Sequence, residues 1–179
     1  RMIIGPWGHG PSQSYGGVDF GVNANMKMFD RELKFYDYHL KGIMNGLDTE
    51  DPVQLFYMGV NKWRSEKDYP LPETKFTPFY LTSAGKANSV TGNGQLVSEK
   101  PNTGGTDRYT YDPLHPILTL GGNNCCGTPT EAGPADQRPI ERREDVLVYT
   151  SDFITTPLTI AGPVKIKLFA ATDGPDTDW

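Results

Sequence analysis

One histidine stands where an acid–base catalyst could act. His9 lies in Gly5-Pro6-Trp7-Gly8-His9-Gly10, directly after the short apolar run at residues 2–4. An apolar strand followed by a glycine-bounded loop is how an α/β enzyme presents a base beyond the carboxyl end of its sheet. In a Ser-His-Asp system one imidazole nitrogen meets the serine hydroxyl and the other meets a carboxylate. His9 is therefore a candidate general base; the alternative is a loop histidine with an ordinary backbone hydrogen bond.

The sequence contains no serine in the pattern of a nucleophile elbow. Such a serine needs Gly-x-Ser-x-Gly, because the sharp strand-to-helix turn excludes side chains on both sides. Ser14 is followed by Gly16 but preceded by Ser12, and Ser83 fails in the same way. In α/β-hydrolases the chain order is Ser, acid, His. His9 fits that order only if both partners lie upstream of this chain.

The other reactive or metal-binding side chains predict no further site from their local sequence. Cys125 and Cys126 are adjacent in a glycine-rich loop without a base partner, so they are most simply loop residues that line a surface or cleft. The acidic cluster at Asp173, Asp176 and Asp178 lacks the later glutamate of a calcium loop, which favours a polar turn. The three histidines have no metal-ligand spacing. We expect neither a metal nor a cofactor.

Composition narrows the class of protein. The 179 residues include 20 Gly and 15 Pro, too many for a helical bundle. A net charge of -5 argues against a nucleic-acid partner. No stretch approaches the roughly 20 apolar residues of a membrane span, so a membrane partner is not expected either. Localisation, whether cytoplasmic or exported, and oligomeric state stay open, and a homo-oligomer is compatible with the sequence.

One segment has a helical pattern. It runs from Asn25 to Leu40 without Gly or Pro. Apolar residues recur every three or four positions on one face: Met26, Phe29, Leu33, Tyr36 and Leu40. Asn23 or Asn25 is the predicted N-cap, and Gly42 is the predicted glycine after the last turn.

Short strands are predicted outside this helix. Residues 2–4 form an apolar run typical of a buried strand. Strand patterns follow at 53–58, 75–82, 107–111, 145–150, 158–160 and 164–170. Many short strands between turn residues favour a β-sandwich or jelly roll for the later part of the chain.

The order of the motifs resembles the cocaine esterase / X-Pro dipeptidyl-peptidase family of serine hydrolases. The segment Ile4-Gly5-Pro6-Trp7-Gly8-His9-Gly10 looks like the catalytic-His loop of that family. The resemblance continues, in order, through residues 35–42, 53–59, 63–64, 69–72, 111–113, 121–122, 133–139, 145–149 and 162–178. It covers essentially the whole chain, and the order is specific although each motif alone is weak.

The resemblance implies a mixed fold. Residues 1–46 would be the C-terminal end of an α/β-hydrolase domain, with a strand, the His loop and a helix that packs on the sheet. Residues 47–179 would be the N-terminal part of a galactose-binding-like jelly-roll β-sandwich. The object would then be a piece of a longer protein. Its expected partner is the remainder of its own polypeptide, with the upstream Ser, Asp and cap domain.

The resemblance also assigns roles. His9 maps onto the triad histidine of a serine hydrolase that cleaves a small-molecule ester or amide, and this chain alone would be inactive. Trp7, Cys125 and Cys126 become candidate substrate-binding residues, since residues 123–132 take the place where the family's jelly roll reaches over the active site. The chemistry would be that of an esterase, an acylase or an X-Pro dipeptidyl-peptidase.

Two other interpretations remain open. The chain could be a jelly-roll carbohydrate-binding or structural module, with Trp63, Trp179 and the nine tyrosines as stacking surfaces. It could also be one product of proteolytic nicking that stays bound to its other half. Glycan binding by the chain would favour the first of these, and intact-mass measurement would decide the second.

Overall fold

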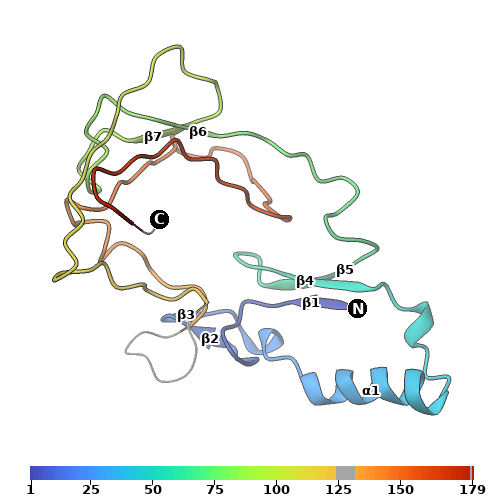
Figure 1. The fold of residues 1–179 in the computed structure, drawn as a ribbon. Helices are drawn as coiled ribbons and strands as arrows, with labels where there is room; N and C mark the ends of the chain where they lie inside the picture. The colour runs from blue at the N-terminus through green and yellow to red at the C-terminus, as the bar shows by residue number, and fades with distance from the viewer. Residues whose placement is uncertain (124–131, 178) are drawn as a thin grey trace.

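The computed structural model describes residues 1–123, 132–177 and 179. Within them regular structure is mostly strand, with a single α-helix, and the labelled elements end at residue 97 (Figure 1). The elements are β1 Met2–Ile4, β2 Ser14–Tyr15, β3 Val18–Asp19, the 3-10 helix η1 Val22–Ala24, α1 Met28–Lys41, the 3-10 helix η2 Leu47–Thr49, β4 Val53–Tyr57, β5 Lys62–Glu66, β6 Tyr80–Thr82 and β7 Gln95–Val97.

A three-stranded sheet in the order β1-β4-β5 carries the first part of the chain. β1 is parallel to β4, with Met2 opposite Val53, and β4 is antiparallel to β5. The strands predicted at 2–4 and 53–58 are thus formed, but the predicted burial of the first is wrong. Met2 and Ile4 are 40% and 42% exposed, because β1 lies at the edge of this sheet. The sheet also joins strands on both sides of residue 46.

The buried core is formed mainly by β4, the central strand. Because side chains alternate along a strand, Val53, Leu55 and Tyr57 share one face, where Leu71 packs against them. Phe56 points to the other face and contacts Phe20 and Ala24. Two small apolar clusters therefore hold β4 from both sides.

Helix α1 starts later than predicted. It begins at Met28, and Lys27 at the N-cap position makes no side-chain capping hydrogen bond. Neither Asn23 nor Asn25 is therefore the cap. The preceding residues form η1 instead, and the carbonyl of Asn23 accepts a hydrogen bond from the indole of Trp63 at 2.7 Å. This tertiary contact lies within η1, where the chain turns more tightly than in an α-helix.

The other end of α1 matches the prediction. The helix ends at Lys41, and Gly42 has a left-handed φ of 67° with its N–H bonded to the carbonyl of Asp37. Glycine takes this conformation without the steric penalty that a Cβ atom would add.

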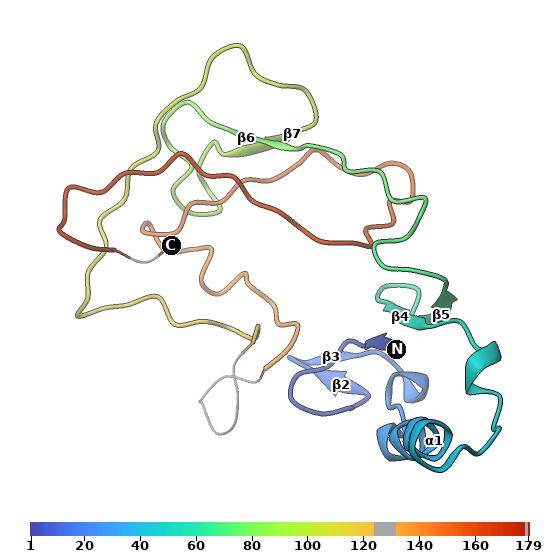
Figure 2. The same ribbon diagram turned by 45° about the vertical axis from the view of Figure 1, so that its right-hand side comes forward.

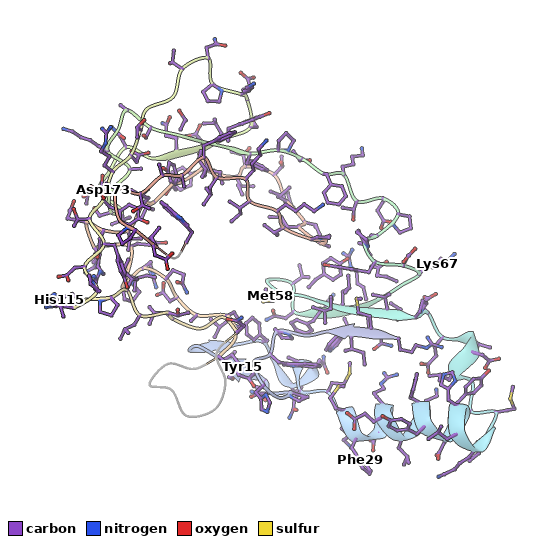
Figure 3. All side chains as sticks on the ribbon, in the orientation of Figure 1. Tyr15, Phe29, Met58, Lys67, His115 and Asp173 are labelled. Carbon is purple, nitrogen blue, oxygen red and sulfur yellow. The ribbon has the colours of Figure 1, made fainter. Side chains whose placement is uncertain are left out.

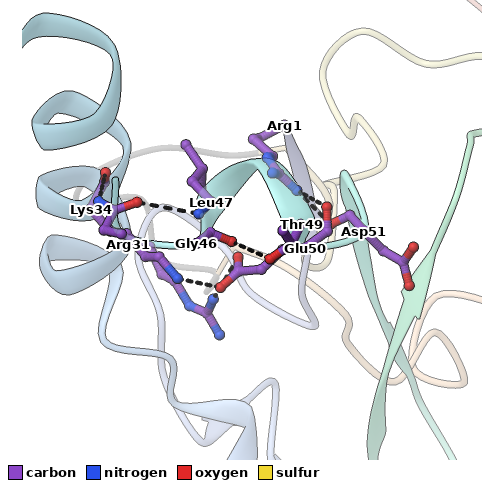
Figure 4. Close-up of polar contacts among 9 residues, drawn as sticks. Arg1, Arg31, Lys34, Gly46, Leu47, Thr49, Glu50 and Asp51 are labelled. Carbon is purple, nitrogen blue, oxygen red and sulfur yellow. Dashed lines mark hydrogen bonds and ion pairs between the residues drawn. The ribbon is translucent and has the colours of Figure 1, made fainter. Parts of the chain in front are cut away.

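The predicted apolar face of α1 is exposed. Phe29, Leu33 and Leu40 are 74%, 45% and 76% exposed, so the expectation that this face packs on the sheet is not met in this chain. The helix is held from its polar side, where Arg31 and Lys34 pair with Glu50 beside η2 (Figure 4). Polar contacts rather than apolar burial place the helix here.

The later part of the chain contains fewer strands than predicted. β6 and β7 pair antiparallel, and isolated bridges join residues 88 to 147 and 95 to 150. The predicted strand at 75–82 starts only at Tyr80, and those at 107–111, 145–150, 158–160 and 164–170 are not formed in the described residues. Val164, Ile166 and Phe169 are 78%, 75% and 93% exposed. A strand needs a hydrogen-bonding neighbour, and no described segment pairs with 158–170.

The whole chain is open rather than compact. Two views show the segments after β5 extending away from the three-stranded sheet and returning beside β2 and β3 near residues 132–137 (Figures 1 and 2). The accessible surface is 13786 Å², whereas a compact 19.8 kDa monomer exposes about 8600 Å². None of the described helices is both long and apolar enough to cross a membrane.

Candidate functional site

His9 is the exposed residue of the loop at residues 5–10, which follows β1 directly. Because β1 and β4 are parallel, this loop leaves the sheet at the edge where their carboxyl ends meet. That edge is where open α/β sheets bind and transform ligands. The sequence-predicted position of His9 is therefore the one that the backbone adopts, and the imidazole is accessible.

Trp7 anchors the His9 loop to η1 and β5. Its indole N–H donates a hydrogen bond of 2.6 Å to the carbonyl of Ala24 in η1. Its ring lies 5.5 Å, centroid to centroid, from Trp63 of β5, which in turn lies 5.2 Å from Phe56. The position of Trp7 is thus explained by packing, and a role in substrate binding stays a prediction.

Tyr15 anchors the same loop at the residue that follows His9. Its hydroxyl donates a hydrogen bond to the carbonyl of Gly10, the residue after His9. Tyr15 ends β2, and it lies where the segment after residue 132 meets this part of the molecule (Figure 3). Sequence reasoning missed this residue, since one tyrosine among nine carries no local signal.

A distant segment also reaches the His9 loop. Gly122 and Gly133 form an antiparallel bridge with two backbone hydrogen bonds of 2.7 and 2.8 Å. From there Ala132 and Gly133 lie against Gly8, close enough that a Cβ atom at Gly8 would be 2.8 Å from the Cβ of Ala132. Cys125 and Cys126 lie outside the described residues, so their predicted place near His9 stays a prediction.

The other histidines belong to separate local groups. His39 is exposed on α1, with its ring 4.4 Å from that of Phe35. His115 pairs with Asp112 at 2.7 Å on an exposed turn, and this hydrogen bond lowers the pKa of the Asp112 carboxyl. In the part of the chain that the structure describes, no three His, Cys, Asp or Glu side chains gather in a way that could hold a metal ion.

Comparison with known proteins decides the family. The profile described as the X-Pro dipeptidyl-peptidase C-terminal non-catalytic domain matches residues 45–179, about three quarters of the chain. The chain belongs to the cocaine esterase / X-Pro dipeptidyl-peptidase-like family, as its C-terminal portion. His9, at the edge of the three-stranded sheet, precedes the residues that match this non-catalytic domain.

Two groups of relatives have names that indicate esterases. The chain is 39% identical over 183 residues to cocaine esterase of Rhodococcus sp. (strain MB1 Bresler), covering 100% of this chain and 32% of that protein. It is 28% identical over 194 residues to "Putative serine esterase Mb1866c" of Mycobacterium bovis and to "Putative serine esterase MT1883" of Mycobacterium tuberculosis, covering 98% of this chain and 26% of each. The chain thus spans a quarter to a third of the length of these relatives.

A hydrogen-bonded cluster around the single carboxylate of Asp107 stabilises the part of the chain that matches the non-catalytic domain. Asp107 accepts hydrogen bonds from the hydroxyls of Ser83 and Tyr149, each at 2.7 Å, and from the amide of Ala87 at 2.8 Å. Burial opposes ionisation of Asp107, but these donors outweigh it and lower the pKa of the carboxyl. Burial and the bond to Asp107 raise the pKa of Tyr149 to about 12. The cluster joins segments that are far apart in sequence, and its role is structural.

A second charged cluster fixes α1 to the sheet. Glu50 pairs with Lys34 and Arg31, and the hydrogen bond from Lys34 is the main cause that lowers the pKa of the Glu50 carboxyl. Arg1 donates to the carbonyls of Glu50 and Asp51 at 2.6 and 2.8 Å (Figure 4). A hollow of about 450 Å³ beside this cluster is lined by residues of α1 and η2 together with Arg1, Glu50 and Pro52, and His9 is not among its lining residues.

Proposed function

We propose that this chain is the C-terminal part of a serine hydrolase and supplies the histidine of its Ser-His-Asp triad. The observation that carries the proposal is the accessible His9 on a glycine-flanked loop at the carboxyl edge of a parallel strand pair. The matches to proteins named as esterases, which include this loop, support it.

In the proposed reaction His9 moves protons. It takes the proton of an upstream serine as that hydroxyl attacks the carbonyl carbon of an ester or amide. It then protonates the leaving group, and afterwards activates a water molecule that hydrolyses the acyl-enzyme. An upstream aspartate orients the imidazole, and backbone donors outside this chain stabilise the oxyanion. This chemistry requires no cofactor.

The remainder of the polypeptide is the proposed partner of this chain. The described chain exposes about 5000 Å² more than a compact protein of its mass. The exposed surface includes the apolar side chains of α1, which are of the type that proteins bury. We propose that residues 1–46 complete an α/β-hydrolase domain with the upstream segment, and that the rest forms part of a jelly-roll domain.

The carbohydrate-binding alternative finds little support in the aromatic side chains. Trp63 is engaged by the rings of Trp7 and Phe56, and its indole N–H is bonded to Asn23. A sugar-stacking platform needs a free ring face, and the ring of Trp63 is half-buried in these contacts. Trp179 is 65% exposed and has an edge contact with Tyr109.

Replacement of His9 tests the proposal. In the full-length protein, His9→Ala should reduce the hydrolysis of a nitrophenyl ester by on the order of 10³-fold or more, because the base that activates the serine is lost. His39→Gln, a matched change at an exposed histidine on α1, should leave turnover near that of the unsubstituted protein. Retained turnover in the His9→Ala protein, with a normal fold by circular dichroism, would remove His9 from the mechanism.

A further inference from the structure

Segment 132–135, defined as Ala132 to Ala135, touches the His9 region at two glycines. At Gly8, an added Cβ atom would lie 2.8 Å from the Cβ of Ala132. At Gly16, in the turn between β2 and β3, an added Cβ atom would lie 2.1 Å from the carbonyl oxygen of Pro134. Both distances are shorter than a Cβ atom tolerates, so glycine at these two positions allows the segment to approach.

Gly10, the residue after His9, and Gly17, the residue after Gly16, have open space around them. No atom of the described residues would lie within 4 Å of a Cβ atom added at either position. Crowding is therefore confined, among these four positions, to the glycines that face segment 132–135. Gly16 and Gly17 both have a left-handed φ, of 56° and 79°, so they differ in their surroundings and not in the kind of backbone conformation.

The segment is itself held firmly in place. Gly133 is bridged to Gly122 by two backbone hydrogen bonds. The side-chain amide of Gln137 donates to the carbonyl of Leu120 at 2.9 Å and to that of Ala135 at 3.1 Å. These bonds tie segment 132–135 to the strand-poor part of the chain, which belongs to the family's non-catalytic domain.

We infer that segment 132–135 is a positioning element for the His9 loop. It lies against Gly8, the residue before His9, while the hydroxyl of Tyr15 donates a hydrogen bond to the carbonyl of Gly10, the residue after His9. The domain described as non-catalytic would thereby set the position of the catalytic base, without contact to the reacting atoms. The inference rests on the proposed function of His9. Displacement of a catalytic group by about 1 Å can cost on the order of 10²-fold in rate.

The Gly16 and Gly17 pair tests this inference. In the full-length protein, Gly16→Ala should lower kcat for a nitrophenyl ester about ten-fold or more relative to Gly17→Ala, with KM changed by less than about two-fold. The acid limb of the pH profile of kcat/KM should also move in Gly16→Ala, because the surroundings of the imidazole change. Both variants place an alanine at a positive φ, so an effect of positive φ alone is expected in both. Equal kcat values and pH profiles in the two variants would overturn the inference.

Two further comparisons keep the test decisive if Gly16→Ala does not fold. Gly8→Ala should lower kcat more than Gly10→Ala, since only an alanine at position 8 meets Ala132 and the ring of Tyr15. Gln137→Ala removes two of the hydrogen bonds that hold the segment and adds no bulk, so it should also lower kcat. Unchanged kcat in Gln137→Ala together with equal values for Gly8→Ala and Gly10→Ala would reject the positioning role.

Failure of the inference is distinguishable from failure of the proposed function. If His9→Ala abolishes turnover while the glycine pairs behave alike, the histidine is catalytic and segment 132–135 does not position it. If His9→Ala retains turnover, both the proposed function and the inference are wrong.

Discussion

The imidazole of His9 is accessible because glycines stand on both sides of it. A side chain at position 8 would meet Ala132 and the ring of Tyr15, and this restriction is invisible in the sequence. The sequence does show that a glycine-bounded histidine follows an apolar strand, and that was sufficient to predict a loop position directly after β1. The residues that contact this loop, by contrast, belong to no sequence pattern that would have predicted the contact.

Asp107 provides a pH-dependent prediction at the same scale. Its pKa is lowered in the fold, so the folded protein binds fewer protons than the unfolded chain as pH falls toward 4. The stabilisation is fully present above about pH 4 and is lost as pH falls through the lowered pKa. Asp107→Asn in the full-length protein should reduce the free energy of unfolding at pH 7 by about 1–2 kcal/mol. Urea unfolding at several pH values measures this.

A matched change distinguishes this cluster from surface charge. Asp112→Asn also removes a carboxylate with a lowered pKa, but Asp112 and His115 are exposed, and exposed ion pairs contribute little to stability. Its effect should be small at every pH. An Asp107→Asn protein as stable at pH 7 as the Asp112→Asn protein would contradict the role given to the cluster.

At the scale of elements, β5 and η1 matter because both contact Trp7, which lies in the His9 loop. Trp63 of β5 contacts Trp7 and donates to Asn23. The strand pattern of β5, Lys62–Glu66, was not predicted, because charged and polar residues dominate it. Its pairing with β4 shows that a buried neighbour can order a polar strand at a sheet edge.

Substitutions of Trp63 test this support. Trp63→Phe keeps a ring and loses one hydrogen bond, and should cost about 1 kcal/mol of unfolding free energy. Trp63→Ala also removes the ring contacts and should cost about 2–3 kcal/mol, less than at a fully buried site because Trp63 is half-buried. Chemical denaturation of the full-length variants gives both values, and equal stability of the two would show that the ring contacts contribute nothing.

Helix α1 shows what periodicity can and cannot decide. Its apolar spacing predicted the helix, and Gly42 predicted its end. The predicted start of the helix was wrong, since a tertiary hydrogen bond from Trp63 to Asn23 favours η1 at that place. The pattern also identifies an apolar face, but it does not say what covers that face, and in this chain Phe29 and Leu33 remain exposed.

At the scale of the whole molecule, the large exposed surface gives a further prediction. The residues that the structure describes form two small buried clusters, and a core of this size supplies little stability against the conformational entropy of 179 residues. Residues 1–179 produced alone should bind a hydrophobic dye strongly, because of apolar patches, whereas the full-length protein should not. Dye fluorescence at equal molar concentration measures the difference.

Charged substitutions on α1 make that prediction specific. Leu33→Glu and Leu40→Glu should lower dye binding by the isolated chain and destabilise the full-length protein, in which we propose that this face is covered. Glu32→Gln, on the polar side of the same helix, serves as the control. An isolated chain that unfolds cooperatively without dye binding would show that it is an independent domain.

The sequence by itself determined the family, the helix, the strands at 2–4 and 53–58, and the place of His9, because each depends on local pattern or on the order of motifs along the chain. Tertiary structure alone decided that β1 pairs in parallel with β4, that the segments expected as strands after residue 97 form no strand among the described residues, and that segment 132–135 lies against Gly8. Pairing partners and close contacts between distant residues depend on where the whole backbone goes. Spacing between neighbouring residues does not carry that information.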